Sequence, residues 1–411
     1  MRIRDIRPVL LTAPFGTEGG RRSACFVEVE TDEGIVGLGE SYAGMYAPEL
    51  AAAIVEWFKP LLVGSAFRAR GGDPGKSGSK AGGARSSAEE AIEALMQGLD
   101  ACNPERVYRL GYWVASSIGR TGLMVMVLSA IENAVWDIQG KALGVPVHAL
   151  LGGAVHGRLP VYASGGIPPF SIDQLVDQAK AARSAGYRGY KMKTNFFVYQ
   201  PEVEAERVGA VRAAIGPDMA LAVDAVQSLN LKPWTVKQVL EMLDRLAPYE
   251  LAWAEEMLQP LDPRTHAELR NSTQVRIAGG EGITTAAQFG QWLRDGAFDL
   301  AQPDATIIGG IGEARRACEL ARAHEVPVAV HVWGAAPAIM ANYNLAFSQA
   351  GSTWLERPVM YNPLADELMI EPLRIEDGHA LPPTAPGLGI ALTPEIKARY
   401  PYVPGSATMV A

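Results

Sequence analysis

The chain has 411 residues, of which 48% are hydrophobic and 20% are charged, a composition typical of a globular protein. This length predicts one large domain with a companion, or two domains, rather than a single small core. The formal net charge of −8 argues against a nucleic-acid partner, because nucleic-acid binders gather Lys and Arg on one face. No apolar run is long enough to cross a bilayer, so no membrane partner is expected.

Cysteine usage and the N-terminal residues bear on the cellular compartment. The three cysteines, Cys25, Cys102 and Cys318, lie far apart in the sequence and match no metal-ligand spacing. Their odd number and apolar neighbours predict reduced, buried thiols. The first residues contain no apolar core or cleavage site of a secretory signal. Together these features predict a cytoplasmic location.

The N-terminal region is predicted to form an antiparallel sheet. Alternation of apolar and polar residues predicts three strands, over residues 1–14, 26–30 and 35–40. A turn at residues 31–34 joins the last two strands into a hairpin. A polar, Gly-rich loop at residues 15–22 separates the first strand from the second.

Helical patterns dominate the next hundred residues. Residues 48–59 predict a helix with Pro48 in its first turn and Pro60 at its end. Residues 64–87 are rich in Gly, Ser, Ala, Lys and Arg, and they predict a surface loop or insertion. A contact between these basic residues and an anionic substrate is the alternative. Helical periodicity returns at Ala88 and continues to Leu151.

From Pro160 onward, short apolar runs alternate with amphipathic stretches of helical period. Eight runs occur, at residues 161–163, 189–193, 220–224, 251–255, 275–281, 298–304, 328–331 and 353–356. Eight strands that alternate with helices predict a parallel barrel of the TIM type. The alternation alone also permits a doubly wound open sheet, but the count of eight favours the barrel.

Most of these runs carry an ionisable residue at or near the C-terminal end of the strand. In chain order these residues are Lys193, Asp224, Glu255, Glu281, Asp304, His331 and Glu356. Because the C-terminal ends of all barrel strands open onto one face, we expect these side chains to meet in one cleft. Each residue taken alone is compatible with a solvated strand end. Their shared phase favours a common site.

Three successive acids, Asp224, Glu255 and Glu281, predict a metal site. Carboxylates that converge cannot all stay ionised without a cation, because like charges raise each other's pKa. A ligand set made only of oxygen atoms suits Mg²⁺ better than zinc. We therefore predict one Mg²⁺ per subunit. The alternative is that one or two of these acids pair with Lys or Arg on the barrel rim.

Candidate bases lie on either side of the three acids. Lys191 and Lys193 are two residues apart on one strand, so both side chains point to the same face. Mutual repulsion and a nearby divalent cation predict a lowered pKa for one ammonium group, as a general base requires. Asp304 and His331 are placed so that the carboxylate accepts from one imidazole nitrogen and the other nitrogen faces a substrate. Two solvated lysines and a structural histidine are the alternatives.

These residues resemble the enolase superfamily, and within it the mandelate racemase subgroup, over nearly the whole chain. Lys191-Met192-Lys193 resembles its paired-lysine motif, and residues 131–141 and 150–153 resemble the segment that leads into its barrel. The remaining matches are the metal ligands Asp224, Glu255 and Glu281, the dyad Asp304 and His331, and the acid Glu356 near the substrate carboxylate. The chain departs from the family pattern at Val226-Gln227 and at Met257, where the family often has Asn and Pro.

The resemblance implies a (β/α)₇β barrel, a modified TIM-type barrel, with an α+β capping domain. It implies a capping domain at residues 1–125, a barrel at 126–360 and a C-terminal segment at 361–411 that completes the capping domain. The loop from Phe15 to Arg22 would close over the substrate. Candidate substrate contacts besides Glu356 are Asn195, Gln227 and Trp333.

The chemistry implied by the resemblance is abstraction of the proton next to a carboxylate, through an enediolate. The metal and Lys191 offset the charge that develops on the carboxylate. Lys193 or His331 removes the α-proton, and Asp304 supports the histidine. Members that keep both the second lysine and the His–Asp dyad are mostly acid-sugar dehydratases. The resemblance therefore implies dehydration of an aldonate or aldarate to a 2-keto-3-deoxy acid.

Other functions fit the same residues. A racemase or epimerase of a 2-hydroxy acid needs two bases on opposite faces of the substrate, and a lactone cycloisomerase is a further option. A protein that holds a metal and binds an acid without turnover is the non-enzymatic alternative. The presence of both Lys193 and His331 argues against it. The expected partner is a small carboxylate, and the family implies a homo-oligomer, either a dimer or an octamer.

Overall fold

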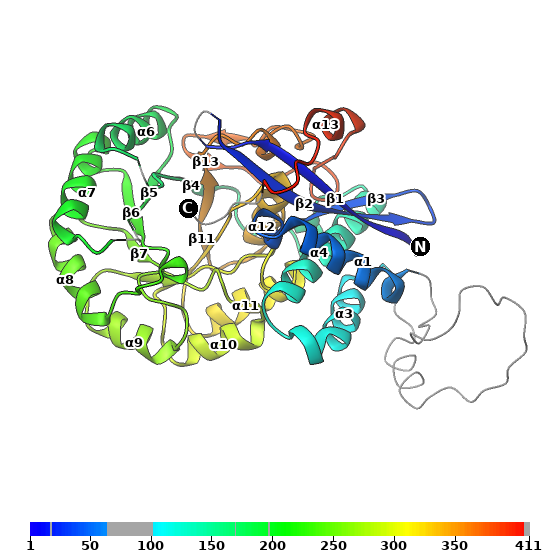
Figure 1. The fold of residues 1–411 in the computed structure, drawn as a ribbon, viewed down its shortest axis with the longest axis horizontal. Coiled ribbons are helices and arrows are strands. Elements are labelled where there is room, and N and C mark those ends of the chain that lie inside the picture. The colour runs from blue at the N-terminus through cyan, green and yellow to red at the C-terminus, as the bar shows by residue number, and fades with distance from the viewer. Residues whose placement is uncertain (17–18, 64–101, 169, 196–197, 407–411) are drawn as a thin grey trace, which may run out of the picture.

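The computed structural model describes residues 1–16, 19–63, 102–168, 170–195 and 198–406 (Figure 1). The predicted insertion at 64–87, and the start of the helical region that follows it, lie outside these residues. Within the described part of the chain, no helix is both long enough and apolar enough to cross a membrane.

The N-terminal region contains a three-stranded antiparallel sheet, as predicted. Its strands, in spatial order, are β1 (Ile3–Pro14), β2 (Arg21–Thr31) and β3 (Val36–Ser41). The loop between β1 and β2 is shorter than predicted, because Arg21 and Arg22 pair with Pro14 and Ala13 at the start of β2. The helices of this region are α1 (Pro48–Leu62), α3 (Pro104–Gly119) and α4 (Leu123–Leu143).

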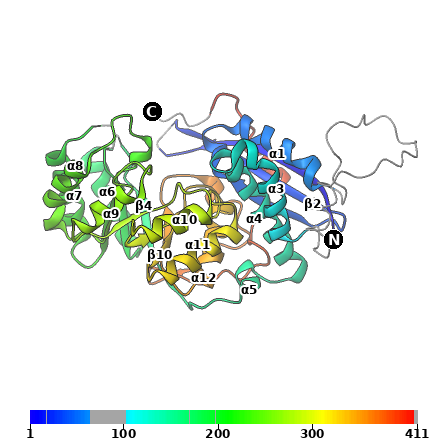
Figure 2. The same cartoon turned by 90° about the horizontal axis from the view of Figure 1, so that it is seen from below.

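Helix α4 packs directly on the backbone of β3. A Cβ atom placed on Gly39 would lie 1.9 Å from the carbonyl oxygen of Ala130, so only glycine permits this approach. Figure 2 shows α1, α3 and α4 beside the sheet, and α4 also contacts the barrel helix α11 (Ile311–Ala323). The glycine therefore lets α4 pack closely on the sheet.

The prediction that Pro60 ends the first helix was wrong. Helix α1 continues through Pro60 to Leu62. Pro60 lacks an N–H group and cannot donate a hydrogen bond within the helix. The loss of this hydrogen bond normally kinks or ends a helix. Here Leu62 is buried in the same cluster as Ile54 and Phe58, and this burial offsets the missing hydrogen bond.

Eight parallel strands form a closed barrel, which confirms the predicted TIM-type fold. They are β4 (Leu159–Gly165), β5 (Gly189–Lys193), β6 (Ala220–Asp224), β7 (Trp253–Glu255), β8 (Ile277–Gly279), β9 (Leu300–Ala301), β10 (Val328–Val330) and β11 (Ser352–Pro358). Strand β11 pairs with β4, so the sheet has no open edge between its first and last strands. A doubly wound open sheet is therefore excluded.

Helices surround the barrel on its outer side (Figures 1 and 2). They are α6 (Ile172–Ser184), α7 (Pro201–Ile215), α8 (Val236–Leu246), α9 (Pro263–Asn271), α10 (Ala286–Arg294), α11 (Ile311–Ala323) and α12 (Ala336–Ser348), and the short α5 (Val147–Leu150) precedes β4. Inside the barrel, an apolar layer includes Tyr162, Ala222, Trp253, Ala278, Leu300 and Ala329. This layer fills the barrel below the charged strand ends.

The C-terminal segment returns to the N-terminal sheet. After the hairpin of β12 (Ile375–Glu376) and β13 (His379–Ala380), α13 (Pro394–Arg399) leads back to β1. There the Thr12 N–H donates to the carbonyl of Tyr400 at 3.2 Å, and Val403 N–H donates to the Thr12 hydroxyl at 3.0 Å. The domain boundaries at residues 125 and 360 remain a prediction.

Two buried acids of the N-terminal region join it to barrel helices. Glu40 of β3 accepts the backbone N–H groups of Ala335 and Ala338 at the start of α12. Glu132 of α4 accepts those of Ile311 and Gly312 at the start of α11. Burial raises the pKa of Glu40 to about 7 and that of Glu132 to about 8, while these donors oppose the rise. Carboxylates at helix N-termini are favourable partners for the helix dipole.

Candidate active site

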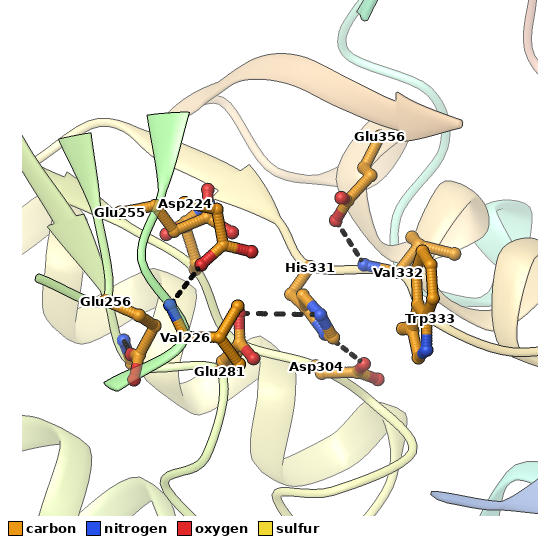
Figure 3. A network of polar contacts seen from close by, with 12 residues as sticks. Asp224, Val226, Glu255, Glu256, Glu281, Asp304, His331, Val332, Trp333 and Glu356 are labelled. Carbon is orange, nitrogen blue, oxygen red and sulfur yellow. Dashed lines mark hydrogen bonds and ion pairs between the residues drawn. The ribbon is translucent and has the colours of Figure 1, made fainter. Parts of the chain in front are cut away.

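The barrel register brings the charged strand ends to one end of the barrel. Lys193 at the end of β5 is the register partner of Asp224 at the end of β6, and Asp224 is the partner of Glu255 at the end of β7. Figure 3 shows Asp224, Glu281 and His331 directed toward a common space. Residues far apart in the sequence therefore meet, as expected from the barrel.

A left-handed turn at Gly280 directs Glu281 into the site. Gly280 has φ +107°, a conformation that side chains rarely adopt, and a Cβ there would lie 2.8 Å from the Phe289 ring. Beyond this turn, Glu281 Oε2 lies 3.5 Å from His331 Nε2. The glycine is thus required by both the backbone conformation and the available space.

Each of the two lysines is paired with carboxylates. Lys191 forms ion pairs with Glu255 and with Glu356, the latter at 2.8 Å, and Lys193 pairs with Asp224 at 2.6 Å. Burial by itself lowers the pKa of both ammonium groups, but the carboxylates outweigh it and raise both values above the usual range. The predicted lowering of one lysine pKa also required a nearby divalent cation, so it remains a prediction. The pairing with acids exceeds the repulsion between the two lysines.

His331 is held between two acids. Its Nδ1 lies 2.8 Å from Asp304 Oδ2, and Asp304 is fixed in turn by the Thr306 N–H and the Asn342 amide. Burial lowers the pKa of His331, but Glu281 and Asp304 outweigh burial and raise it to about 10. These two acids therefore favour the protonated imidazole, with Nε2 on the side of Glu281. Such a group can act as a general acid.

Glu255 and Glu256 occupy different environments. Both oxygens of Glu255 are bonded: one to Lys191, the other to the Trp253 indole and the Gln302 amide. Glu256 lines the cavity, and its carboxylate accepts the Gly280 N–H at 3.3 Å. Burial, with the charges of Glu281 and Asp224, raises the pKa of Glu256 well above its usual value. Glu255 points into the barrel, so strand alternation predicts that Glu256 points out of it. The left-handed backbone at Glu256, with φ 47°, instead places this residue at the cavity.

The donor chemistry at the strand ends fits Mg²⁺. Among the described residues, no three acidic, imidazole or thiol side chains are gathered closely enough to hold a metal ion as they stand. Nevertheless, Asp224, Glu255 and Glu281 are oxygen donors at one barrel end, and Glu281 Oε2 is buried without a hydrogen bond. The lysines hold the oxygens of Asp224 and Glu255, so metal binding requires these ion pairs to exchange partners.

A cavity of about 580 Å³ lies between the N-terminal region and the barrel. The N-terminal region contributes Phe15, Arg22, Tyr42, Met45 and Tyr46 to its lining, and the barrel contributes Lys193, Val226, Glu256, Glu281, His331 and Trp333. The ring of Tyr42 packs edge-on against His331, with centroids 6.3 Å apart. The volume is in the range of small-molecule sites.

Both halves of the chain match family models. Residues 174–396 match the model described as Enolase C-terminal domain-like, and residues 4–152 match that of the mandelate racemase/muconate lactonizing enzyme N-terminal domain. The chain is a member of the mandelate racemase/muconate lactonizing enzyme family. The predicted resemblance to the enolase superfamily is confirmed.

Relatives within this family include enzymes that act on sugar acids. The chain is 30% identical to a D-galactarolactone cycloisomerase of Agrobacterium fabrum, over 90% of this chain and 89% of the relative. It is also 30% identical to an L-talarate/galactarate dehydratase of Salmonella typhimurium, over 75% and 74% of the two chains. A crystal structure of L-talarate dehydratase from Polaromonas sp. JS666, complexed with Mg and L-glucarate, superposes with a TM-score of 0.75. That chain is 28% identical, and the match covers 97% of this chain and 96% of that one.

The four predicted substrate contacts of this family member lie in different places. Trp333 lines the cavity. Glu356 is buried and paired with Lys191, and it accepts the Val332 N–H at 2.8 Å. Gln227 is buried and bonded within its own loop, and Asn195, whose N–H donates to Glu204, is not among the described residues that line the cavity. The position of Gln227 indicates a structural role.

Val226, which departs from the family pattern, adopts a strained conformation. Its φ of 41° is a genuine outlier for a β-branched residue. Its N–H donates to Asp224 Oδ1 at 2.9 Å, and its side chain lines the cavity. Strain of this kind is commonly found where a neighbouring functional group must be held in place. Here that group is the Asp224 carboxylate.

Proposed function

We propose that the protein removes the α-proton of a sugar acid and eliminates water, which yields a 2-keto-3-deoxy acid. The observation that carries this proposal is that Lys193 and His331 line the same cavity. Each contacts one of the predicted metal ligands, Asp224 for Lys193 and Glu281 for His331. A base and an acid on one substrate are the minimum that β-elimination requires.

Asp224, Glu255 and Glu281 would hold one Mg²⁺. When bound, the ion supplies positive charge to the substrate carboxylate as negative charge develops there in the enediolate. Lys191, buried between Glu255 and Glu356, supplies a second positive charge at the floor of the site. The Mg-bound crystal structure of the Polaromonas dehydratase supports the choice of metal.

Lys193 is assigned as the base and His331 as the acid. While Lys193 pairs with Asp224 its pKa is raised, so it becomes a base only when Asp224 takes another partner. The α-proton then passes to Lys193 Nζ. The C–O bond at the β-carbon breaks, and its electron pair leaves with the hydroxyl group. The His331 proton converts this group to water, and the remaining enol tautomerises to the keto acid.

A lactone cycloisomerase is the second candidate, because the relative of that name matches 90% of this chain. The same proton abstraction applies, with a ring oxygen as the leaving group. A racemase or epimerase would instead return a proton to the α-carbon from the opposite face. A homo-oligomeric state remains a prediction.

The purified protein with Mg²⁺ should be tested on aldonates, aldarates and their lactones. Formation of semicarbazide-reactive product from an open-chain acid supports dehydration, and product from the lactone alone supports a cycloisomerase. Solvent deuterium at the α-carbon without keto product indicates a racemase. The absence of both product and deuterium exchange with every acid contradicts the proposal. Equal exchange in wild type, Lys193→Ala and His331→Asn favours a binding protein.

A further inference from the structure

A buried arginine lines the cavity without an acidic partner. Arg22 is 8% exposed and shares the cavity with Lys193 and His331. No described residue forms an ion pair with its guanidinium group. The charge of Glu40 acts on Arg22, but the Glu40 oxygens accept N–H groups at the start of α12. An unpaired buried charge is costly, so it calls for a partner.

Two aromatic rings hold the guanidinium in place. Its carbon lies 4.6 Å from the centroid of Phe15 and 5.2 Å from that of Trp333, and the two rings meet edge-on. The guanidinium donates to the Met45 sulfur and, at 3.5 Å, to the Trp333 carbonyl. An arginine has five N–H donors in a planar fork, and these contacts leave most of them for a ligand.

The distance from Arg22 to the reacting groups suits a short substrate. Lys193 Nζ also lies 5.2 Å from the Trp333 ring centroid. Because both cations lie at this distance from one ring, they are at most about 10 Å apart. The carboxyl carbons of a six-carbon diacid are about 6 Å apart, from bond lengths of about 1.5 Å. With an ion pair at the far end, such a molecule can reach from one group to the other.

We propose that Arg22 binds a second carboxylate of the substrate, so that the enzyme selects sugar diacids over monoacids. The inference rests on the proposed function, since both concern the same cavity. A sugar hydroxyl group does not neutralise a guanidinium, whereas a carboxylate does so with two parallel hydrogen bonds. Among the described lining residues, Arg22 is the one cationic group outside the Lys193–His331 end, and a single charge suits a carboxylate better than a phosphate dianion.

Binding can be measured without turnover. Calorimetry on the Mg²⁺-loaded protein should compare 2-hydroxyglutarate with 2-hydroxyvalerate, which differ in the distal carboxylate, and with 3-phosphoglycerate. We expect the diacid to bind about 10- to 100-fold more tightly than the monoacid. Arg22→Met should reduce this preference to below about threefold, and Arg22→Lys should give an intermediate value. Arg21→Met, at the exposed neighbouring residue of β2, is the matched control and should keep the preference.

The outcomes separate this inference from the proposed function. Equal affinity of the wild type for diacid and monoacid overturns it, even if Arg22→Met does not fold. A preference retained in Arg22→Met, or tighter binding of 3-phosphoglycerate than of the diacid, overturns it as well. If no sugar acid is dehydrated but the Arg22-dependent preference is present, the proposed function fails and the assignment of Arg22 stands. If dehydration occurs and monoacids are preferred, the proposed function stands and the assignment of Arg22 fails.

Discussion

The indole ring of Trp333 contacts both the Lys193 ammonium and the Arg22 guanidinium, each 5.2 Å from its centroid. Trp333 belongs to the barrel loop that follows His331, and Arg22 belongs to the N-terminal sheet. One side chain therefore links the reacting groups to the residue that we assign to recognition. A cation over an indole face is attracted by about 0.5–2 kcal/mol, so this ring helps to position both charges.

The two assigned catalytic groups should be separable by their partial reactions. Lys193→Met should lower both α-proton exchange and dehydration by about 10²- to 10⁴-fold, because it removes the base. His331→Asn should lower dehydration by a similar factor and retain more of the exchange, because it removes the acid that acts on the hydroxyl group. NMR in D₂O and the keto-acid assay measure the two reactions. Full exchange in Lys193→Met would assign the base elsewhere.

Magnesium affinity should distinguish Glu255 from Glu256. The family motif assigns the metal ligand to Glu255, whereas Glu256 is the one of the two that lines the cavity. We expect Glu255→Gln to weaken Mg²⁺ binding more than about 100-fold and Glu256→Gln less than about 100-fold, since loss of an outer partner costs about 10- to 100-fold. Calorimetric titration with Mg²⁺ measures both. The opposite order would transfer the ligand role to Glu256.

The barrel could be predicted from the sequence because its pattern is local. Strands β5 and β6 match the predicted residues, since each apolar run alternates with an amphipathic helix. The charged strand ends follow from the same repeat. The pairing of the two lysines with particular carboxylates could not be predicted from this repeat, because it depends on which oxygen each ammonium group reaches. Glu256 and Arg22 were missed for related reasons: a left-handed backbone turns Glu256, and the lack of a partner for Arg22 is visible only in three dimensions.

Gly280→Ala should destabilise the protein and disturb Glu281. The new Cβ would meet Phe289 at 2.8 Å and hold a φ of +107°, so we expect a loss of about 1–3 kcal/mol in the free energy of unfolding. Mg²⁺ affinity should fall as well. Gly282→Ala is the control, because nothing lies within 4 Å of its added Cβ. Equal stability of the two variants in denaturant unfolding would contradict the strain argument.

Stability should depend on pH through Glu40. Burial raises the pKa of Glu40 from 4.5 to about 7, so the folded state binds its proton more tightly than the unfolded state. Its contribution to stability is fully present below about pH 4.5 and is lost as the pH rises through about 7. Between pH 5 and pH 8, wild type should therefore lose on the order of 2–3 kcal/mol more of its free energy of unfolding than Glu40→Gln.

Denaturant unfolding at the two pH values measures this difference. Glu325→Gln, at an exposed position, is the matched control and should follow the wild type. If Glu40→Gln has the same pH profile as the wild type, the carboxyl of Glu40 does not titrate in this range.

Metal removal tests the central claim, that carboxylates at the barrel end hold a cation which makes the α-proton of a sugar acid labile. The measurement is the rate of α-deuterium incorporation into a substrate sugar acid in D₂O, before and after exhaustive chelation and after return of Mg²⁺. We predict that exchange falls by at least about 10³-fold on chelation and returns with Mg²⁺, as the loss of several kcal/mol of charge stabilisation requires. Exchange that continues unchanged in the chelated protein would contradict it.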